Sequence, residues 1–181
     1  MNLDSLTKLY VHELKDLYSA EKQLVEALPR MAQAATNKDL KKAIRDHLAA
    51  TKRQVQRLDK VFARTEFSPR GHKCEGMAGL IKEGASLLKE DSEPDVLDAG
   101  IIAAAQRVEH YEMAAYGTAR AMAERLGGGE AAVGRAEHAL EQLVARLPAE
   151  RVVHRPEAVD VHDEDRQPPA GRERRGERLL E

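Results

Sequence analysis

The chain has 181 residues, a length that fits one domain with a sizeable core and is short for two. Charged residues make up 33% and aromatic residues only 3%, with no tryptophan, a composition that predicts an all-α protein with helices packed through alanine and leucine. The formal net charge is −2 with both signs mixed along the chain, which argues against nucleic-acid binding because no basic face gathers to neutralise phosphates.

Two long helices are predicted at the start of the chain. Between residues 5 and 35, apolar residues recur every three or four positions, as on one buried helix face, with Pro29 as a kink near the end. The same spacing resumes over residues 39–62, after Thr36 and Asn37, which offer an N-cap. Because the connection is short, we expect these two helices to pack as an antiparallel hairpin.

A shorter helix is predicted over residues 74–89, interrupted by Gly79 and Gly84, each of which is costly inside a helix. We expect this helix to belong to a crossover connection rather than to the bundle itself. Pro94 then opens a third long helix, which ends at the glycine run that begins with Gly127. The many alanines on one face of this helix imply a close approach to its neighbours.

A fourth long helix is predicted over residues 130–146, although Gly134 lies inside it. Beyond Pro148 the chain is rich in charge and proline with few large apolar residues, and such a segment cannot offset the entropy lost on ordering. We therefore predict a four-helix bundle over residues 1–148, made of two antiparallel hairpins joined by a crossover with a short helix. A disordered charged tail is predicted over residues 149–181.

The N-terminus has no positive stretch followed by an apolar run, and no segment approaches the ~20 apolar residues of a membrane span. We expect a cytoplasmic protein without a membrane partner. The single cysteine, Cys74, has no second thiol with which to form a disulfide or a metal pair, so we expect an ordinary thiol.

Polar residues fall in register with two of the predicted apolar faces. Glu21 lies between Leu17 and Leu24 on the inward stripe of the first helix, where an unpaired carboxylate is costly to bury. His47 and Gln54 lie on the inward face of the second helix. An inward histidine alone is more often a hydrogen-bonded structural residue than a metal ligand.

Two carboxylates share the inward stripe of the third long helix. Glu109 and Glu112 are one turn apart there, with His110 and Tyr111 nearby, and like charges in a core need protonation or a metal. Carboxylates and an imidazole from several helices are what a two-metal carboxylate site requires. The residues alone leave an alternative open, in which these glutamates lie at the edge of the apolar stripe and their side chains reach solvent.

A resemblance to a bacterial family rests on three segments: LKDLYSAEKQL at residues 14–24, His47-Leu48 followed by Thr51 and Gln54, and IAAAQRVEHYE at residues 102–112. Together these segments resemble the YciE/YciF-type ferritin-like stress proteins, over about Leu6 to Ala132. The resemblance implies a ferritin-like bundle, a di-iron or other two-metal centre, frequent homodimers, and expression linked to stress such as osmotic or acid shock. No reaction is firmly assigned to that family.

Carried over by position, the resemblance implies four metal ligands, Glu21, His47, Glu109 and Glu112, with Gln54 as a further inward polar match. The expected metal is iron, as a di-iron centre, or manganese. Carboxylate-rich sites suit these metals, whereas zinc usually attracts more histidine or cysteine.

The chain also departs from the family pattern. Ala49 and Ala50 stand where family members usually carry acidic residues. In the predicted fourth helix, the available donors are Glu137, His138 and Glu141, and the Glu-x-x-His order usual in this architecture is absent. This departure weakens the prediction of a second metal position.

Three functions fit these observations. The first is a metal-binding stress protein that binds Fe(II), with oxidation by dioxygen or peroxide as a further step. The second is a non-catalytic bundle whose inner polar residues form a hydrogen-bonded network and which acts through self-association, as a homodimer, or through partner binding. The third is an oxidoreductase with an organic substrate, since the fold does not choose the reaction. Whether the protein is an enzyme stays open on the sequence alone.

Overall fold

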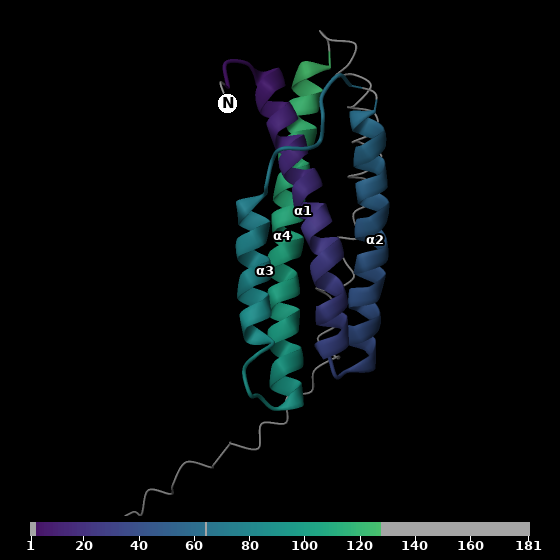
Figure 1. Cartoon of the computed structure of the whole chain (residues 1–181), viewed down its shortest axis with the longest axis vertical. Helices are drawn as coiled ribbons and strands as arrows, with labels where there is room; N and C mark the ends of the chain where they lie inside the picture. Colours follow the sequence, from purple (N-terminus) through teal and green to yellow (C-terminus); the bar gives the residue numbers. More distant parts are fainter. Residues whose placement is uncertain (1–2, 64, 128–181) are drawn as a thin grey trace, which may run out of the picture.

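The structure of the protein is a computed structural model, of which residues 3–63 and 65–127 are described. It contains four α-helices, which are α1 (Leu6–Ala34), α2 (Lys38–Phe62), α3 (Glu75–Leu87) and α4 (Pro94–Leu126) (Figure 1). These residues contain no strand, so the all-α prediction is confirmed. Within the same ranges no helix has the length and apolar character needed to cross a bilayer.

The helices lie along one long axis, and each runs in the direction opposite to the helix before it (Figure 1). α1 and α2 form the expected antiparallel hairpin, and the chain then returns through α3 to the end at which α4 begins. α4 therefore runs parallel to α2 and antiparallel to α1, as the predicted crossover requires. The predicted fourth long helix at 130–146 and the tail at 149–181 lie outside the described residues.

The helix ends follow the capping signals in the sequence. Ser5 caps α1, its side chain accepting a hydrogen bond from the backbone N–H of Lys8, and Asn37 caps α2 in the same way. Pro94 occupies the first turn of α4, where its missing N–H costs nothing. Pro29 lies inside α1, which continues to Ala34.

The expected interruption of the third helix was wrong. α3 runs unbroken through Gly79 and Gly84. Gly84 is buried where α3 meets α4, and a Cβ atom added to it would lie 3.4 Å from the Cβ of Ala104. This would be an ordinary van der Waals contact, so the packing of α3 against α4, and not a need for glycine at this position, offsets the cost that glycine carries in an isolated helix.

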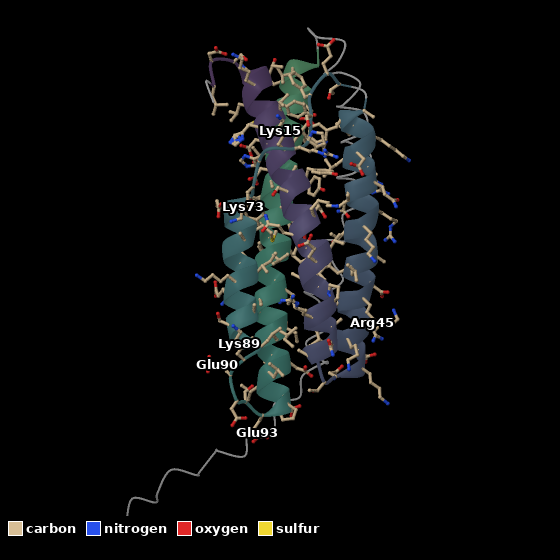
Figure 2. All side chains as sticks on the ribbon, viewed as in Figure 1. Lys15, Arg45, Lys73, Lys89, Glu90 and Glu93 are labelled. Carbon is tan, nitrogen blue, oxygen red and sulfur yellow. The ribbon has the colours of Figure 1, made fainter. Side chains whose placement is uncertain are left out.

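Charged side chains lie on the outside of the bundle (Figure 2), and Lys73, Lys89, Glu90 and Glu93 point outward from the segments on either side of α3. The apolar core inside falls into two clusters, one toward each end of the α1–α2 hairpin. Buried polar residues lie between them: Glu21 on α1, Gln54 on α2 and Glu112 on α4. The sequence thus places a polar layer at the middle of an otherwise apolar interior.

A buried carboxylate fixes the start of α4 against the α1–α2 turn. Asp98 Oδ1 accepts a hydrogen bond from the Thr36 backbone N–H at 2.8 Å. Its Oδ2 accepts from the Thr36 hydroxyl and from the Asn37 N–H, each at 2.7 Å. These three bonds fix the position of α4 along the axis of the α1–α2 hairpin. They thereby determine which residues of α4 lie beside the buried polar residues of α1 and α2.

The Asp98→Asn variant is expected to lose about 1.5 kcal/mol of unfolding free energy, because an amide presents a donor where the turn needs an acceptor. Urea denaturation measures this loss. Asp95→Asn, at an exposed position in the first turn of α4, is the matched control and should change stability by less than about 0.5 kcal/mol. Equal losses in the two variants would contradict the role given to Asp98.

Candidate metal centre

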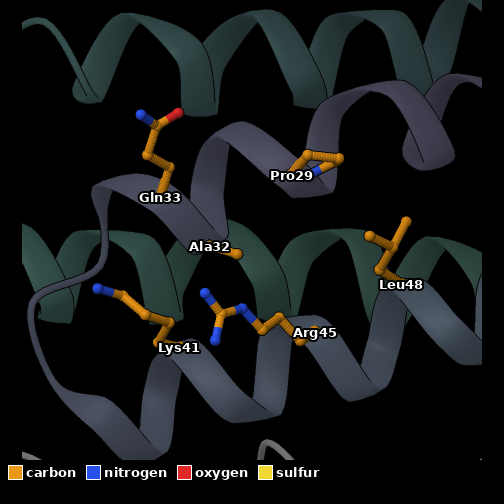
Figure 3. A pocket seen from close by; sticks show the side chains of 6 residues that line it. All are labelled: Pro29, Ala32, Gln33, Lys41, Arg45 and Leu48. Carbon is orange, nitrogen blue, oxygen red and sulfur yellow. The ribbon is translucent and has the colours of Figure 1, made fainter.

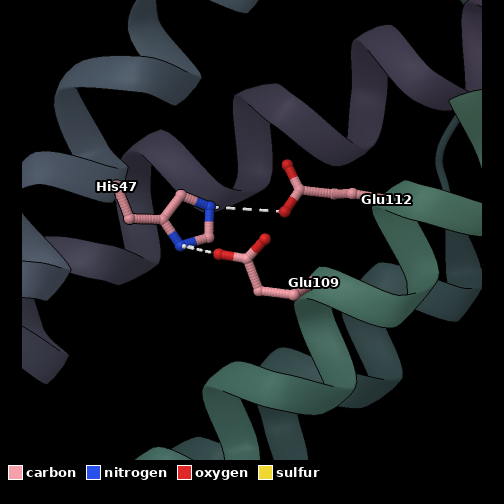
Figure 4. Close-up of side chains that lie close together, drawn as sticks. All are labelled: His47, Glu109 and Glu112. Atoms are coloured by element: carbon pink, nitrogen blue, oxygen red, sulfur yellow. Dashed lines mark ion pairs between the residues drawn. The ribbon is translucent and has the colours of Figure 1, made fainter. Parts of the chain in front are cut away.

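Three of the four predicted ligands meet at the middle of the bundle (Figure 4). The His47 ring on α2 lies between two carboxylates of α4, with Nδ1 3.0 Å from Glu109 Oε1 and Nε2 3.3 Å from Glu112 Oε2. One potential ligand atom from each residue lies within 4.8 Å of the other two. The one-turn spacing of the glutamates on α4 makes this convergence possible.

The trio is largely shielded from water. The side chains of Glu112, His47 and Glu109 are 4%, 10% and 18% exposed, so solvent reaches the site mainly past Glu109. Burial lowers the pKa of His47, but the hydrogen bond to Glu112 and the negative charges of both glutamates outweigh it and raise that pKa above its ordinary value. Burial raises the pKa of Glu109, which the charge of Glu112 raises further and that of His47 lowers.

Glu21, the fourth predicted ligand, is fully buried beside this trio. The Tyr116 hydroxyl donates a hydrogen bond of 2.6 Å to its Oε1. Its Oε2 has no hydrogen-bond partner among the described residues. The neighbouring Glu112 carboxyl would repel an ionised Glu21. Burial and the charge of Glu112 raise the pKa of Glu21 well above its ordinary 4.5.

The sequence predicts only some of the other polar residues at the middle of the bundle. Gln54 is buried, as expected for an inward position. Thr51, also buried, has an Oγ1 without a hydrogen-bond partner among the described residues, and it lies one turn after His47. Tyr116 was missed, although it lies one turn after Glu112 on the same stripe, which is the signal that could have identified it.

Further candidates do not join the centre. His110 is exposed on α4, where its Nδ1 lies 2.8 Å from the Gln106 carbonyl oxygen. The three possible donors of the predicted fourth helix, Glu137, His138 and Glu141, lie outside the described residues.

The donor set suits a hard or borderline divalent cation. Two carboxyl groups contact the imidazole and the Glu21 carboxyl lies next to Glu112, so even a protonated His47 would leave the fully ionised cluster with excess negative charge. A divalent cation would balance that charge and would use the free Oε2 of Glu21. Carboxylate oxygens with one imidazole nitrogen match the ligands that Fe(II) and Mn(II) accept.

The metal-free protein is expected to lose stability as pH rises from about 5 through neutrality. The folded state keeps protons on Glu21 and Glu109 at pH values where the unfolded carboxyls, with an ordinary pKa of 4.5, have released them. The raised pKa of His47 acts in the same direction, since its contribution is lost as pH rises through the folded value. The lowered pKa of Asp16 opposes this trend only where that group titrates, below about 3.8. Urea denaturation with a chelator across this interval measures the slope, and stability that rises with pH would contradict it.

Comparisons with known proteins agree with this architecture. The family described as "Domain of unknown function (DUF892)" matches residues 5–150, beyond the point near residue 132 where the resemblance seen in the sequence ends. Protein YciF of Escherichia coli K12 is 42% identical over 133 residues, which cover 73% of this chain and 80% of YciF.

Two solved structures are similar to this chain over most of their length. The crystal structure of the E. coli stress protein YciF matches with a TM-score of 0.73 at 37% identity, covering 81% of this chain and 89% of that one. The structure of "YcfI, a putative structural protein from Rhodopseudomonas palustris" matches with a TM-score of 0.68 at 38% identity, covering 82% and 96%.

Proposed function

The chain belongs to the DUF892 family, and we propose, from the geometry of its polar layer, that it binds iron at the middle of its bundle. His47, Glu109 and Glu112 would hold one Fe(II) ion. Glu21, through its Oε2, would hold a second ion that shares Glu112. The observation that carries this proposal is the meeting of two carboxyls and one imidazole, with the buried Glu21 carboxyl next to Glu112, in a shielded layer between two apolar clusters.

The free-energy cost of burying the Glu21 carboxylate supports a bound cation rather than a polar cluster without a ligand. A buried carboxylate with no hydrogen-bond donor for one of its oxygens destabilises the fold, whereas an apolar residue at the same position would not. Glu21 carries that cost on α1, and Glu112 adds repulsion at close range. A cation between them removes the repulsion and satisfies the free oxygen, which gives a physical reason for acidic residues at this depth.

Bound iron would supply one-electron redox chemistry toward dioxygen or peroxide. The residues around it supply position and shielding. Tyr116 holds one oxygen of Glu21 and leaves the other for a cation, while the apolar clusters above and below limit water. The more exposed Glu109 marks the side by which ions and small oxidants would enter.

An organic substrate is not part of this proposal. A pocket of about 320 Å³ lies between α1 and α2, lined by Pro29, Ala32, Gln33, Lys41, Arg45 and Leu48 (Figure 3). None of the four proposed ligands lines it, so it offers no place for a substrate beside the centre.

Anaerobic titration of the metal-free full chain with Fe(II), followed by calorimetry and metal analysis, tests the proposal. We expect about two ions per chain. One ion per chain would reduce the site to the His47, Glu109 and Glu112 position, and no binding would overturn the proposal. Subsequent exposure to dioxygen, monitored by the formation of Fe(III), tests the redox step.

A second candidate function is a structural bundle without metal, favoured by one observation. His47 contacts both carboxylates, and its protonated ring would act as an internal counter-charge. The cluster would then be an ion-pair network, and activity would lie in self-association, as a homodimer, or in partner binding. The Fe(II) titration distinguishes the two functions, and light scattering of the metal-free chain tests for the dimer.

A further inference from the structure

A second group of metal-ligating side chains lies where the segment before α3 crosses α1. His12 and Asp16 are one turn apart on α1. His72, in the segment that leads into α3, places Nε2 2.8 Å from Asp16 Oδ1. The rings of His12 and His72 are nearly perpendicular, with centroids 4.6 Å apart. With His72 and Asp16 24% and 19% exposed, ions in solution can reach the group.

The Asp16 carboxylate is held in a fixed orientation by groups behind it. The Tyr111 hydroxyl donates to Asp16 Oδ2 at 2.5 Å, and the Cys74 thiol lies 2.8 Å from the same hydroxyl. Burial raises the pKa of Asp16, but its hydrogen bonds to Tyr111, Cys74 and His72 lower that pKa below its ordinary value. Asp16 is therefore a carboxylate with Oδ1 directed at His72, and outer hydrogen bonds of this kind orient metal ligands.

His12 supplies a second ring nitrogen that could bind a cation. Its Nδ1 is buried and has no hydrogen-bond partner among the described residues. Such a nitrogen costs free energy unless water, an ion or another group satisfies it. Its place one turn before Asp16, with its ring against that of His72, brings a second imidazole to the same spot.

We propose that His12, Asp16 and His72 form a second cation site, which binds a borderline divalent ion such as Zn²⁺ where the crossover meets α1. Two imidazole nitrogens and one carboxylate oxygen form a three-ligand set that zinc accepts, with water in the fourth position. This set has more nitrogen than the mid-bundle centre and shares no ligand with it, so the two sites should differ in metal preference.

Binding requires a rearrangement of these side chains. In the metal-free state these three side chains do not converge as closely as His47, Glu109 and Glu112. The His12 ring must turn toward Asp16, and the cation replaces the proton shared by His72 and Asp16. A cation there ties the crossover segment to α1, so Zn²⁺ should raise the midpoint of thermal unfolding as well as bind.

Zn²⁺ titration of the full chain, with Co²⁺ as a visible-absorption probe, tests this site. Beyond any Zn²⁺ that the mid-bundle centre takes up, we expect one ion whose affinity falls about 100-fold or more in His12→Ala and in His72→Ala, since both remove a direct ligand. His110→Ala, at an exposed histidine of α4, should bind Zn²⁺ as the wild type does. Fe(II) stoichiometry should stay unchanged in His72→Ala, which separates this site from the mid-bundle centre.

Circular dichroism checks that each variant folds. If His72→Ala unfolds, His72→Gln preserves a hydrogen bond to Asp16 and answers the same question. Zn²⁺ binding that is absent from the wild type, or that is equal in the wild type and both histidine variants, would overturn the proposal.

Discussion

Replacing Glu112 by glutamine is expected to weaken Fe(II) binding by about 100-fold or more, the largest effect of any single substitution at the centre. Glu112 contacts His47 directly and is the carboxyl that acts most strongly on Glu21, so it connects the two proposed ion positions. An amide keeps the size of the side chain but loses the negative charge that a cation needs. Both equivalents of iron should therefore be lost, as measured by anaerobic calorimetry.

The control for this substitution is Glu124→Gln on the same helix. Glu124 is an exposed residue that pairs with Arg120 one turn away, and its change should leave Fe(II) affinity within about twofold of the wild type. Unchanged iron binding in Glu112→Gln would exclude the proposed shared ligand. An equal loss in both variants would show that iron binds to general surface charge.

The second large effect is expected at Glu21, where one substitution should change stability and metal binding in opposite directions. Glu21→Gln keeps an acceptor for the Tyr116 hydroxyl and removes a buried acid that lies next to Glu112. The metal-free variant should gain about 1–3 kcal/mol of unfolding free energy at neutral pH, as often happens when a buried charge is replaced. Its second equivalent of Fe(II) should be lost.

Urea denaturation of the chelated protein and Fe(II) titration measure the two effects in parallel. Glu26→Gln, at an exposed position on the same helix, should change neither. Glu21→Gln should also flatten the fall in stability with rising pH. A Glu21→Gln protein that is less stable than the wild type and binds iron normally would indicate that Glu21 serves the fold alone.

The helices could be predicted well because their signals are local. Ser5 and Asn37 cap the first two helices, and the third long helix begins at Pro94 and ends before Gly127 as the sequence indicates. The error at α3 has a physical cause. The cost of Gly84 is a property of an isolated helix, whereas the close contact with α4 that offsets it depends on the tertiary structure.

The site could be predicted in part, because the depth of a residue follows from helical periodicity. Glu21 and Glu112 are buried as their places on the apolar stripes indicate. The pairing between helices does not follow from periodicity. The bond from Tyr116 to Glu21 joins residues 95 apart in sequence, and the contact of His72 with Asp16 joins residues 56 apart. Such pairs depend on the relative height of the helices, which a single sequence does not show.

Anomalous diffraction from crystals grown with Fe(II) in the absence of oxygen tests most directly whether the middle of the bundle is a metal centre. We predict one anomalous peak in contact with His47, Glu109 and Glu112, and a second peak between Glu112 and Oε2 of Glu21. Clear density for these four side chains with no anomalous peak among them, and with the His47 ring still between its two carboxylates, would contradict the proposed function.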